Sequence, residues 1–158
     1  MRIGLGKDSH RFDFDDKEKA LVLGGVIFDS EPALSGNSDA DVVLHAITNA
    51  ISGITCKNIL GSRADKLCLE QGITDSTVYL KEALSDLEEE NLKIIHLSIS
   101  IECKFPKITP KVCDMRNSIA QLLNISEKSV GITATTGEDL TPFGQGLGIE
   151  CIAIITIE

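Results

Sequence analysis

The fold is decided by the stretch KIIHLSISIEC at residues 93–103. Apolar and polar side chains alternate along it, and in an extended chain successive side chains point to opposite faces. This alternation is typical of a β-strand with one face in the core, so we expect the more apolar set to be buried. That set is Ile95, Leu97, Ile99, Ile101 and Cys103, and the opposite set is Ile94, His96, Ser98, Ser100 and Glu102.

The regions on both sides of this strand add helices and further strands. On its C-terminal side, a proline-containing loop is followed by an expected helix that ends near Leu123, and then by expected strands at 129–135 and 149–157. On its N-terminal side, apolar residues recur every three to four positions, which predicts a helix at about 76–91. The inward residues of that helix are expected to be Val78, Leu80, Ala83, Leu84 and Leu87.

Two extended pieces near the N-terminus complete the pattern. Residues 1–8 are expected to form a strand that runs into a glycine-rich turn, and residues 20–28 a second strand bent at Gly24-Gly25. Strands near both ends, with helices between them, predict an α+β fold: a mixed β-sheet with helices packed on one face. No repeat or linker interrupts the sequence, so we expect residues 1–158 to form a single domain.

The last predicted strand is apolar on both faces. One layer of helices covers only one face of a sheet, so the other face is expected to pack against a second sheet. The two alternating sets are Ile149, Cys151, Ala153, Ile155 and Ile157 on one face, and Ile152 and Ile154 on the other.

Composition narrows the class of partner. The net charge of −9 argues against a surface for nucleic acid or for an anionic membrane. Aromatic residues make up only 4% and tryptophan is absent, which leaves little material for stacking on bases. We therefore expect neither nucleic acid nor a membrane as a partner, and a phosphate-bearing substrate would need local cations or metals to offset the negative charge.

Cysteine usage indicates the compartment. The chain has five cysteines, an odd number, and no C-x-x-C pair, which is typical of free thiols in a reducing cytoplasm. The first residues, MRIGLG, are too short and polar for a targeting or membrane-spanning segment. The expected location is cytoplasmic. The cysteines are Cys56, Cys68, Cys103, Cys113 and Cys151.

Asp8, His10 and His45 form the strongest candidate for a functional site. Asp8 and His10 are two positions apart in an extended segment, so they point to the same face. His45, one of three histidines, falls near the start of the first long helix. One carboxylate and two imidazoles suit zinc, with the fourth position left open for substrate. The alternative is that the Asp-x-His pair lies on a solvated loop and that His45 is an ordinary surface or core residue.

Polar residues surround the start of this first long helix. Ser38 is expected to be its N-cap, with Asp41 three positions later as in a capping box, and Gly53 is expected to end it. The helix N-terminus at Ser38 is a candidate phosphate contact, because free backbone N–H groups and the helix dipole favour anions. Asp41 and His45 share one helix face, so Asp41 either orients His45 or only completes the cap.

A glycine-rich loop at 135–148 is a second candidate. It contains Thr135, Thr136 and Glu138. Hydroxyl and backbone N–H groups at a strand end can hold phosphate oxygens, and a carboxylate there can recruit Mg²⁺. An ordinary glycine-rich turn is the alternative. Lys107 is either a cation for a phosphate or a plain surface lysine.

The order and spacing of these pieces resemble the 2-C-methyl-D-erythritol 2,4-cyclodiphosphate synthase family of the non-mevalonate isoprenoid pathway. The matching segments span almost the whole chain. They are Arg2-Ile3-Gly4, Gly6-Lys7-Asp8-Ser9-His10, Leu23-Gly24-Gly25-Val26, Ser38-Asp39-Ala40-Asp41-Val42, Leu44-His45-Ala46, Pro106-Lys107, Ala134-Thr135-Thr136 with Glu138, and Gly144-x-Gly146-x-Gly148.

The resemblance implies a phosphorus-oxygen lyase of isoprene biosynthesis. It would convert 4-diphosphocytidyl-2-C-methyl-D-erythritol 2-phosphate to 2-C-methyl-D-erythritol 2,4-cyclodiphosphate, with release of CMP. The 2-phosphate attacks the β-phosphorus, so no protein nucleophile is needed, and metals neutralise and align the phosphates. The resemblance also implies a homotrimer in which each active site lies between two subunits and the sheets meet around the threefold axis.

The resemblance assigns roles to individual residues. Zinc is expected at Asp8, His10 and His45, and Mg²⁺ or Mn²⁺ near Glu138 with the substrate diphosphate. Thr136 and Asn37 are the expected catalytic residues, with Thr136 steadying the transition state. Residues 103–109 with Thr135 are expected to form the cytidine pocket. The full substrate-binding set is Asp8, His10, Asn37, Ser38, Gly61, Cys103, Lys104, Phe105, Pro106, Lys107, Ile108, Thr109, Thr135, Thr136, Gly137, Glu138 and Gln145.

The sequence departs from the family pattern around the substrate. Asn37 stands where the family usually has histidine, and Gln145 where it has arginine. The segment 58–61 lacks the family's aspartate, residues 63–68 replace its Phe-Pro-Asp loop, and Asn49 stands where aspartate is common. The metal ligands are all kept, which favours an enzyme with an altered substrate pocket.

Three hypotheses follow from the sequence. The leading one is the metal-dependent cyclising lyase. The second is a non-catalytic or repurposed family member that retains the metal-bound trimer. A zinc hydrolase is the third and weakest, because no general base is evident beside the ligands.

Overall fold

The structure is a computed structural model that describes residues 1–158, apart from the side chain of Ser62. Its main sheet has five strands: β1 (Arg2–Asp13), β4 (Ala33–Leu34), β5 (Ile94–Glu102), β6 (Val130–Thr135) and β7 (Gly148–Ile157). They lie in the order β4-β1-β7-β5-β6. Neighbouring strands are antiparallel except β5 and β6, which are parallel. The sheet is therefore mixed, which confirms the predicted fold class.

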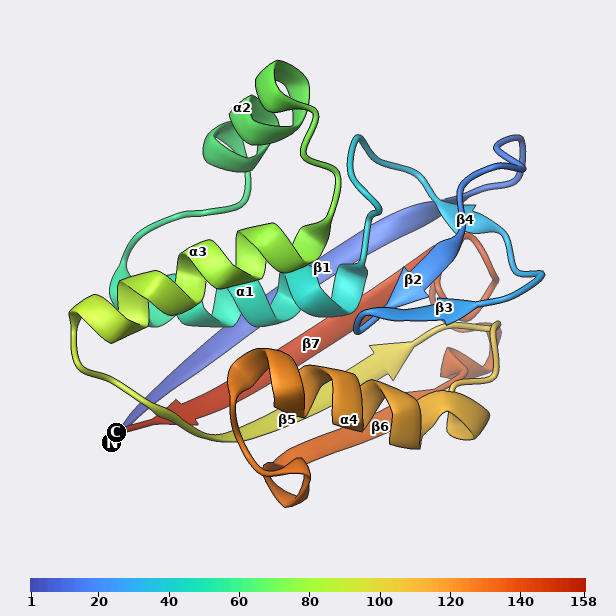
Figure 1. Cartoon of the computed structure of the whole chain (residues 1–158). Coiled ribbons are helices and arrows are strands. Elements are labelled where there is room, and N and C mark those ends of the chain that lie inside the picture. The colour runs from blue at the N-terminus through green and yellow to red at the C-terminus, as the bar shows by residue number, and fades with distance from the viewer.

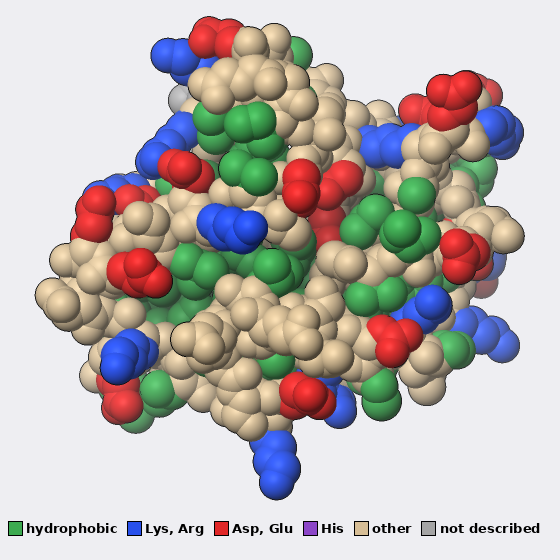
Figure 2. Space-filling view, in the orientation of Figure 1, with side chains coloured by type: hydrophobic (Ala, Val, Ile, Leu, Met, Phe, Trp, Pro, Cys, Tyr) green, Lys and Arg blue, Asp and Glu red, His purple; other side chains and the backbone are tan. Residues whose placement is uncertain are grey.

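All the helices lie on one side of this sheet. They are α1 (Val42–Thr55), α2 (Ser62–Gln71), α3 (Ser76–Glu89) and α4 (Val112–Leu123), with short 3₁₀ helices η1 (Thr109–Lys111), η2 (Glu127–Ser129) and η3 (Gly137–Asp139). Figure 1 shows α1, α3 and α4 over one face, whereas α2 stands above α1 and α3, away from the sheet. Acidic and basic side chains are interspersed over the helical side of the molecule (Figure 2). No helix in the described part of the chain is long and apolar enough to cross a membrane.

The core lies between the helices and the sheet. β7 buries Ile149, Cys151, Ala153, Ile155 and Ile157, as the alternation predicts. On β5, Leu97, Ile99 and Ile101 are buried as predicted, but the prediction for the first two residues of the strand was wrong. A register shift between Ile94 and His96 reverses the pattern there, so Ile94 is 8% exposed and Ile95 is 37% exposed. An irregular pairing of this kind changes which side chain faces the core.

Two glycines allow α1 to lie directly on β1. A Cβ atom at Gly4 would lie 2.2 Å from the carbonyl oxygen of Ala50, and one at Gly6 would lie 2.0 Å from that of Ala46. No larger residue fits either position without separating the helix from the strand. This close approach places the first turn of α1, which carries His45, beside the middle of β1.

The N-terminal strands differ in detail from the prediction. β1 is longer than expected and continues past His10 to Asp13. The second extended piece is a hairpin of β2 (Leu21–Leu23) and β3 (Val26–Phe28) rather than one bent strand. Gly24 and Gly25 both have positive φ angles, 61° and 75°, which is the geometry of a tight two-residue hairpin turn.

The ends of α1 were also predicted incorrectly. Asp41, not Ser38, is the N-cap, and its carboxylate accepts hydrogen bonds from the backbone N–H groups of Val43 and Leu44. The same carboxylate accepts from the two glycine N–H groups of the β2–β3 turn at 2.8 and 2.7 Å. Tertiary contact with that hairpin therefore selects Asp41 as the cap. The helix continues past Gly53 to Thr55.

The remaining elements confirm the predicted order, with one addition. α3, α4, β6 and β7 lie where the sequence predicted them. Residues 63–68, interpreted as a replaced loop, lie within the helix α2 instead. The sheet face opposite the helices carries apolar side chains that no part of this chain covers among the described residues. Ile3, Leu5 and Ile154 are 68%, 65% and 41% exposed there.

Candidate metal centre and active site

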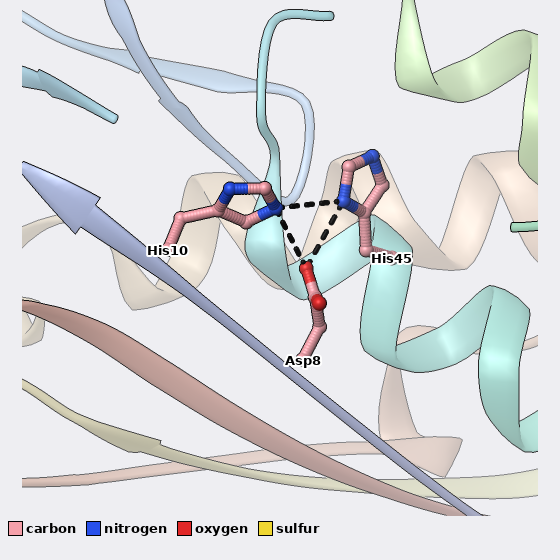
Figure 3. Close-up of side chains that lie close together, drawn as sticks. All are labelled: Asp8, His10 and His45. Carbon is pink, nitrogen blue, oxygen red and sulfur yellow. Dashed lines mark hydrogen bonds and ion pairs between the residues drawn. The ribbon is translucent and has the colours of Figure 1, made fainter. Parts of the chain in front are cut away.

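Asp8, His10 and His45, here called the metal trio, converge at one point (Figure 3). The Asp8 carboxylate oxygen Oδ2 lies 3.0 Å from His10 Nε2 and 3.0 Å from His45 Nδ1. The two imidazole nitrogens lie 3.2 Å apart. Asp8 and His10 share one face of β1, and His45 reaches them from the first turn of α1. The sequence prediction that these three residues lie together is confirmed.

The outer nitrogens of both imidazoles have partners that fix the position of the ring proton. His10 Nδ1 lies 2.8 Å from the backbone carbonyl of Ser35, which can only accept, so Nδ1 carries the proton. His45 Nε2 lies 2.8 Å from the hydroxyl of Ser76. That hydroxyl donates to the carboxylate of Asp39, so it accepts from His45 Nε2–H. Both imidazoles therefore direct a lone pair towards Asp8.

Three electron-pair donors at this spacing fit a zinc ion. Ligand atoms in tetrahedral zinc sites lie about 2.0–2.2 Å from the metal, hence about 3.4 Å from one another. The trio needs only a small expansion to reach that spacing. The donor set of one carboxylate and two imidazoles is also a set that zinc accepts. The metal trio is thus a possible metal site with an open fourth position.

The electrostatics of the trio favour positive charge at its centre. Burial raises the pKa of Asp8, but hydrogen bonds and charge interactions with His10 and His45 outweigh it and hold the pKa at about 2. Burial lowers the pKa of His10, whereas its hydrogen bond and charge interaction with Asp8 raise it by more, so the net shift is upward. Asp8 is therefore ionised at neutral pH, as a metal ligand must be.

The trio lies in a pocket of about 320 Å³. Three other predicted substrate residues, Asn37, Ser38 and Gly61, line the same pocket, and Asn49 lies there as well. The sequence did not reveal the contribution of α2, since that helix was not predicted. The further lining residues are Gly36, Leu60, Ala64, Asp65, Cys68 and Tyr79. A larger cavity lies between the C-terminal ends of α3 and α4, but it is lined mainly by leucine and isoleucine and holds no cluster of metal ligands.

The predicted cytidine loop, residues 103–109, lies beside the glycine-rich loop. The backbone N–H of Cys103 donates to the carbonyl of Thr135 at 3.1 Å. Lys104 donates through its backbone to Phe143 and through Nζ to Asp139 at 2.8 Å. These contacts join the two loops into a second cluster.

Side chains of the cytidine loop divide into buried and exposed groups. Cys103, Pro106 and Ile108 are buried, so their side chains belong to the core. Phe105 stacks on Phe12, with ring centroids 4.6 Å apart. The buried residues therefore offer a ligand only their backbone atoms, and Phe105 offers only its backbone and the edge of its ring. The exposed side chains are those of Lys104, Lys107 and Thr109.

The glycine-rich loop holds strained backbone at its predicted functional residues. Gly137, Glu138 and Asp139 have φ angles of 66°, 50° and 61°, and positive φ is costly for the last two because they carry a Cβ atom. The hydroxyls of Thr135 and Thr136 accept from the N–H groups of Gly137 and Glu138 at 3.2 and 3.4 Å. The side chains of Thr135, Thr136 and Glu138 are exposed.

The structure keeps the two clusters apart within one chain. Among the described residues, those at 103–109 and 135–145 do not line the pocket of the metal trio. Glu138 is likewise separate from the trio. Gln145 is exposed, and its amide donates to the carbonyl of Asp139 at 3.1 Å, within the glycine-rich loop.

The residue that orients His45 was not predicted. Asp41, the sequence candidate, caps α1 and binds the hairpin turn instead. Ser76, at the start of α3, is the actual partner of His45, with Asp39 behind it. Asp75-Ser76 resembles an ordinary helix cap in sequence, so no local signal marks Ser76. His96 is exposed, as predicted.

Comparison with known proteins places the chain in a family. A sequence model of the YgbB family matches residues 1–158. The 2-C-methyl-D-erythritol 2,4-cyclodiphosphate synthase of Chlamydia muridarum is 52% identical over 156 residues, which cover 99% of this chain and 87% of that protein. The synthase of Chlamydia felis is 51% identical over 156 residues, 99% of this chain and 88% of that protein.

Solved structures agree with this match. The bifunctional IspDF from Campylobacter jejuni superposes with a TM-score of 0.87 at 26% identity, and covers 98% of this chain and 41% of that one. A CDP complex of IspF from Plasmodium falciparum gives a TM-score of 0.81 at 29% identity, with 99% and 94% of the two chains covered. The fold, the sequence and the converging aspartate and histidines lead to one assignment: this chain belongs to the YgbB family.

Proposed function

We propose that the protein is an active 2-C-methyl-D-erythritol 2,4-cyclodiphosphate synthase. It converts 4-diphosphocytidyl-2-C-methyl-D-erythritol 2-phosphate to 2-C-methyl-D-erythritol 2,4-cyclodiphosphate and CMP. The observation that carries the proposal is the metal trio with an open fourth position in a pocket, on a chain 52% identical to a synthase of that name. The reaction is an intramolecular phosphoryl transfer, so the protein has to position and neutralise phosphates rather than supply a nucleophile.

Asp8, His10 and His45 are the proposed zinc ligands. Bound zinc supplies a Lewis acid that neutralises phosphate charge and orients the reacting groups. The protein contributes by holding the trio in place. Because Ser35 and Ser76 fix the two imidazole tautomers, both ligand nitrogens face the pocket without rearrangement.

Asn37, Ser38 and Gly61 are the proposed phosphate contacts around this metal. The Ser38 hydroxyl accepts from the Ala40 N–H at 3.1 Å, which leaves its own proton free to donate to a phosphate oxygen. Asn37 is exposed at the pocket, and its amide can donate but carries no charge. A lost charged hydrogen bond weakens binding by about 1.5–3 kcal/mol, so we expect a high KM.

The second cluster is the proposed nucleotide site. Residues 103–109 and Thr135 receive the cytidine, with Cys103, Phe105, Pro106 and Ile108 forming the frame and the exposed Lys104, Lys107 and Thr109 providing polar contacts. The carboxylate of Glu138, next to Gly137, holds Mg²⁺ or Mn²⁺ with the diphosphate. Thr136 steadies the transferred phosphoryl group, and Gln145 keeps the loop closed through Asp139.

A homotrimer is the proposed assembly. The metal pocket and the nucleotide cluster are separate in one chain, so a complete site requires residues from a neighbouring subunit. The bare sheet face, with Ile3, Leu5 and Ile154 exposed, supplies apolar surface for sheets that meet around a threefold axis. Light scattering should give three times the chain mass of 17.0 kDa. Leu5→Asp should dissociate the trimer, and Ile27→Asp, on the separate β2–β3 hairpin, should not.

The test of the reaction is CMP release. Purified protein with zinc, Mg²⁺ and the cytidyl substrate should release CMP, with the cyclic product followed by phosphorus NMR. Glu138→Ala should abolish the Mg²⁺-dependent rate, whereas Glu127→Ala, a similarly exposed glutamate on η2, should not. If zinc-loaded wild type releases no CMP at millimolar substrate, the protein is instead a repurposed relative. The neutral Asn37 and Gln145 are the observations that would favour that alternative.

A further inference from the structure

Hydrogen bonds connect His45 to two side chains, Ser76 and Asp39, that do not line the pocket. Its Nδ1 faces Asp8 and His10, and its other ring nitrogen points away from them (Figure 3). That nitrogen, Nε2, meets the Ser76 hydroxyl at 2.8 Å. Ser76 donates through Oγ to Asp39 Oδ1 and through its backbone N–H to Asp39 Oδ2, the latter at 3.1 Å. Ser76 is fully buried and His45 nearly so.

We infer that Asp39 and Ser76 are positioning residues for the metal ligand His45. A carboxylate can only accept, so the Ser76 hydroxyl donates to Asp39 and accepts from His45 Nε2–H. The chain of hydrogen bonds holds the imidazole in the Nε2–H tautomer and in one ring orientation. Asp39 orients the hydroxyl, and the hydroxyl orients the ring, as outer partners of metal-bound histidines do. The inference rests on the proposed zinc site.

The two histidines of the trio differ in how they are oriented. His10 donates to the backbone carbonyl of Ser35, which no side-chain substitution removes. The outer nitrogen of His45 instead meets a side chain, the Ser76 hydroxyl, with the Asp39 carboxylate behind it. Asp41 cannot replace them, because its two oxygens already accept four backbone N–H groups. The affinity for the metal is therefore open to a test by substitution at positions 39 and 76.

The same aspartate ties the metal ligand to the segment that covers the pocket. The backbone N–H of Asp39 donates to the carbonyl of Thr74 at 2.7 Å, in the loop between α2 and α3. Ala64 and Cys68 of α2 line the pocket, and the Cys68 thiol donates to the carbonyl of Asn37 at 3.1 Å. Asp39 thus bonds to Ser76, the partner of His45, and to Thr74 in the loop that joins α2 to α3. The residues that orient His45 are therefore connected to the helix that lines the pocket.

The test measures zinc affinity without substrate. Competition against a chromophoric chelator should show zinc bound about 10–100-fold more weakly by Ser76→Ala than by wild type. Asp39→Asn keeps one acceptor oxygen and removes the charge, so its loss should be smaller, and it serves if Ser76→Ala does not fold. Cobalt-loaded variants should show altered visible bands. The control is Thr48→Ala, which removes a buried α1 hydroxyl that bonds only to the Leu44 carbonyl.

The outcomes separate this inference from the proposed reaction. Unchanged zinc affinity and cobalt spectra in both Ser76→Ala and Asp39→Asn would overturn the positioning role. Equal weakening in Thr48→Ala would also overturn it, because the effect would then be general loosening of α1. Failure of wild type to release CMP would refute the synthase and leave the zinc measurements intact. Nitrogen NMR of metal-free protein should show His45 with its proton on Nε2 in wild type and a mixture of tautomers in Ser76→Ala.

Discussion

Gly6→Ala tests whether the close contact between β1 and α1 positions the metal trio. A Cβ atom at position 6 would lie 2.0 Å from the carbonyl oxygen of Ala46 and 2.3 Å from the backbone nitrogen of Ala50. Contacts under 3.0 Å essentially never occur for a Cβ atom, so the distance to the Ala46 oxygen must increase by 3.0 − 2.0 = 1.0 Å. Both obstructing atoms belong to the backbone of α1, and no side-chain rotation relieves them. The helix or the strand must therefore shift by about 1 Å.

A shift of this size displaces Asp8 and His45 relative to each other, because both residues lie next to the overpacked contact. Asp8 lies two residues after Gly6, and His45 directly precedes Ala46. Their ligand atoms are 3.0 Å apart, and metal sites tolerate displacements of only about 0.2 Å. Overpacking of a core typically destabilises a protein by about 1–3 kcal/mol. We expect that loss in the free energy of unfolding, together with at least a tenfold weaker affinity for zinc, equivalent to about 1.4 kcal/mol.

The assay pairs urea denaturation of metal-free protein with zinc competition, and the matched control is Gly53→Ala. Gly53 lies on the same helix, but a Cβ atom there meets only the carbonyl of Leu5, at an ordinary 3.7 Å. Alanine in a helix is favoured over glycine by up to about 1 kcal/mol, so the control should be neutral or stabilising. The reasoning is refuted if Gly6→Ala stays within about 0.5 kcal/mol of wild type and binds zinc equally well.

Three further predictions concern the cap, the thiols and the metal. Asp41→Asn places an amide N–H₂ group against backbone N–H donors of the β2–β3 turn or of α1, and should lower the free energy of unfolding by about 1–3 kcal/mol in urea; no change would contradict the cap assignment. At pH 8, iodoacetamide should label the exposed Cys56 and Cys113 but spare Cys103 and Cys151 in peptide mass spectra, because burial raises the pKa of Cys103 to about 12 and that of Cys151 well above its ordinary value. Zinc at 100 times its Kd should stabilise the protein by about 2.7 kcal/mol, seen as a higher Tm that a chelator reverses; a Tm indifferent to zinc would argue against the site.

Elements with strong periodicity were predictable from the sequence. The alternation in β5 and β7 identifies each strand and most of its buried face. The helical spacing identifies α3, with Leu80, Ala83 and Leu87 buried as predicted, but Tyr79 is buried in place of the predicted Val78. The errors arise where a local rule allows two answers. Ser38 and Asp41 are both good caps, and the choice between them depends on the turn at Gly24-Gly25, which is distant in sequence. The shift that turns Ile95 outward depends on pairing with β7.

α2 was missed because its sequence carries little apolar periodicity. SRADKLCLEQ is mostly charged and polar, and only a few residues face the molecule. Gly72, which ends the helix in a left-handed conformation, was its clearest sequence signal. Missing the helix also hid its pocket residues. Likewise, the metal trio follows from residue types and spacing, whereas Ser76, 31 positions from His45, becomes visible only when α3 docks on α1.

The number of ligands in the metal centre bears on the choice between an enzyme and a relic that keeps the metal for its structure. Structural zinc sites are closed by four protein ligands, whereas catalytic sites keep three and leave one position for substrate. In the described part of the chain, the metal trio has no fourth histidine, cysteine or acidic partner. Cys68 lines the same pocket, but its thiol donates to the Asn37 carbonyl. The carboxylate and the two imidazole nitrogens lie 3.0–3.2 Å apart, so they attract one another only through a proton or a metal ion held between them. An open trio with three ligands beside the proposed phosphate contacts is therefore better explained by catalysis than by structure alone.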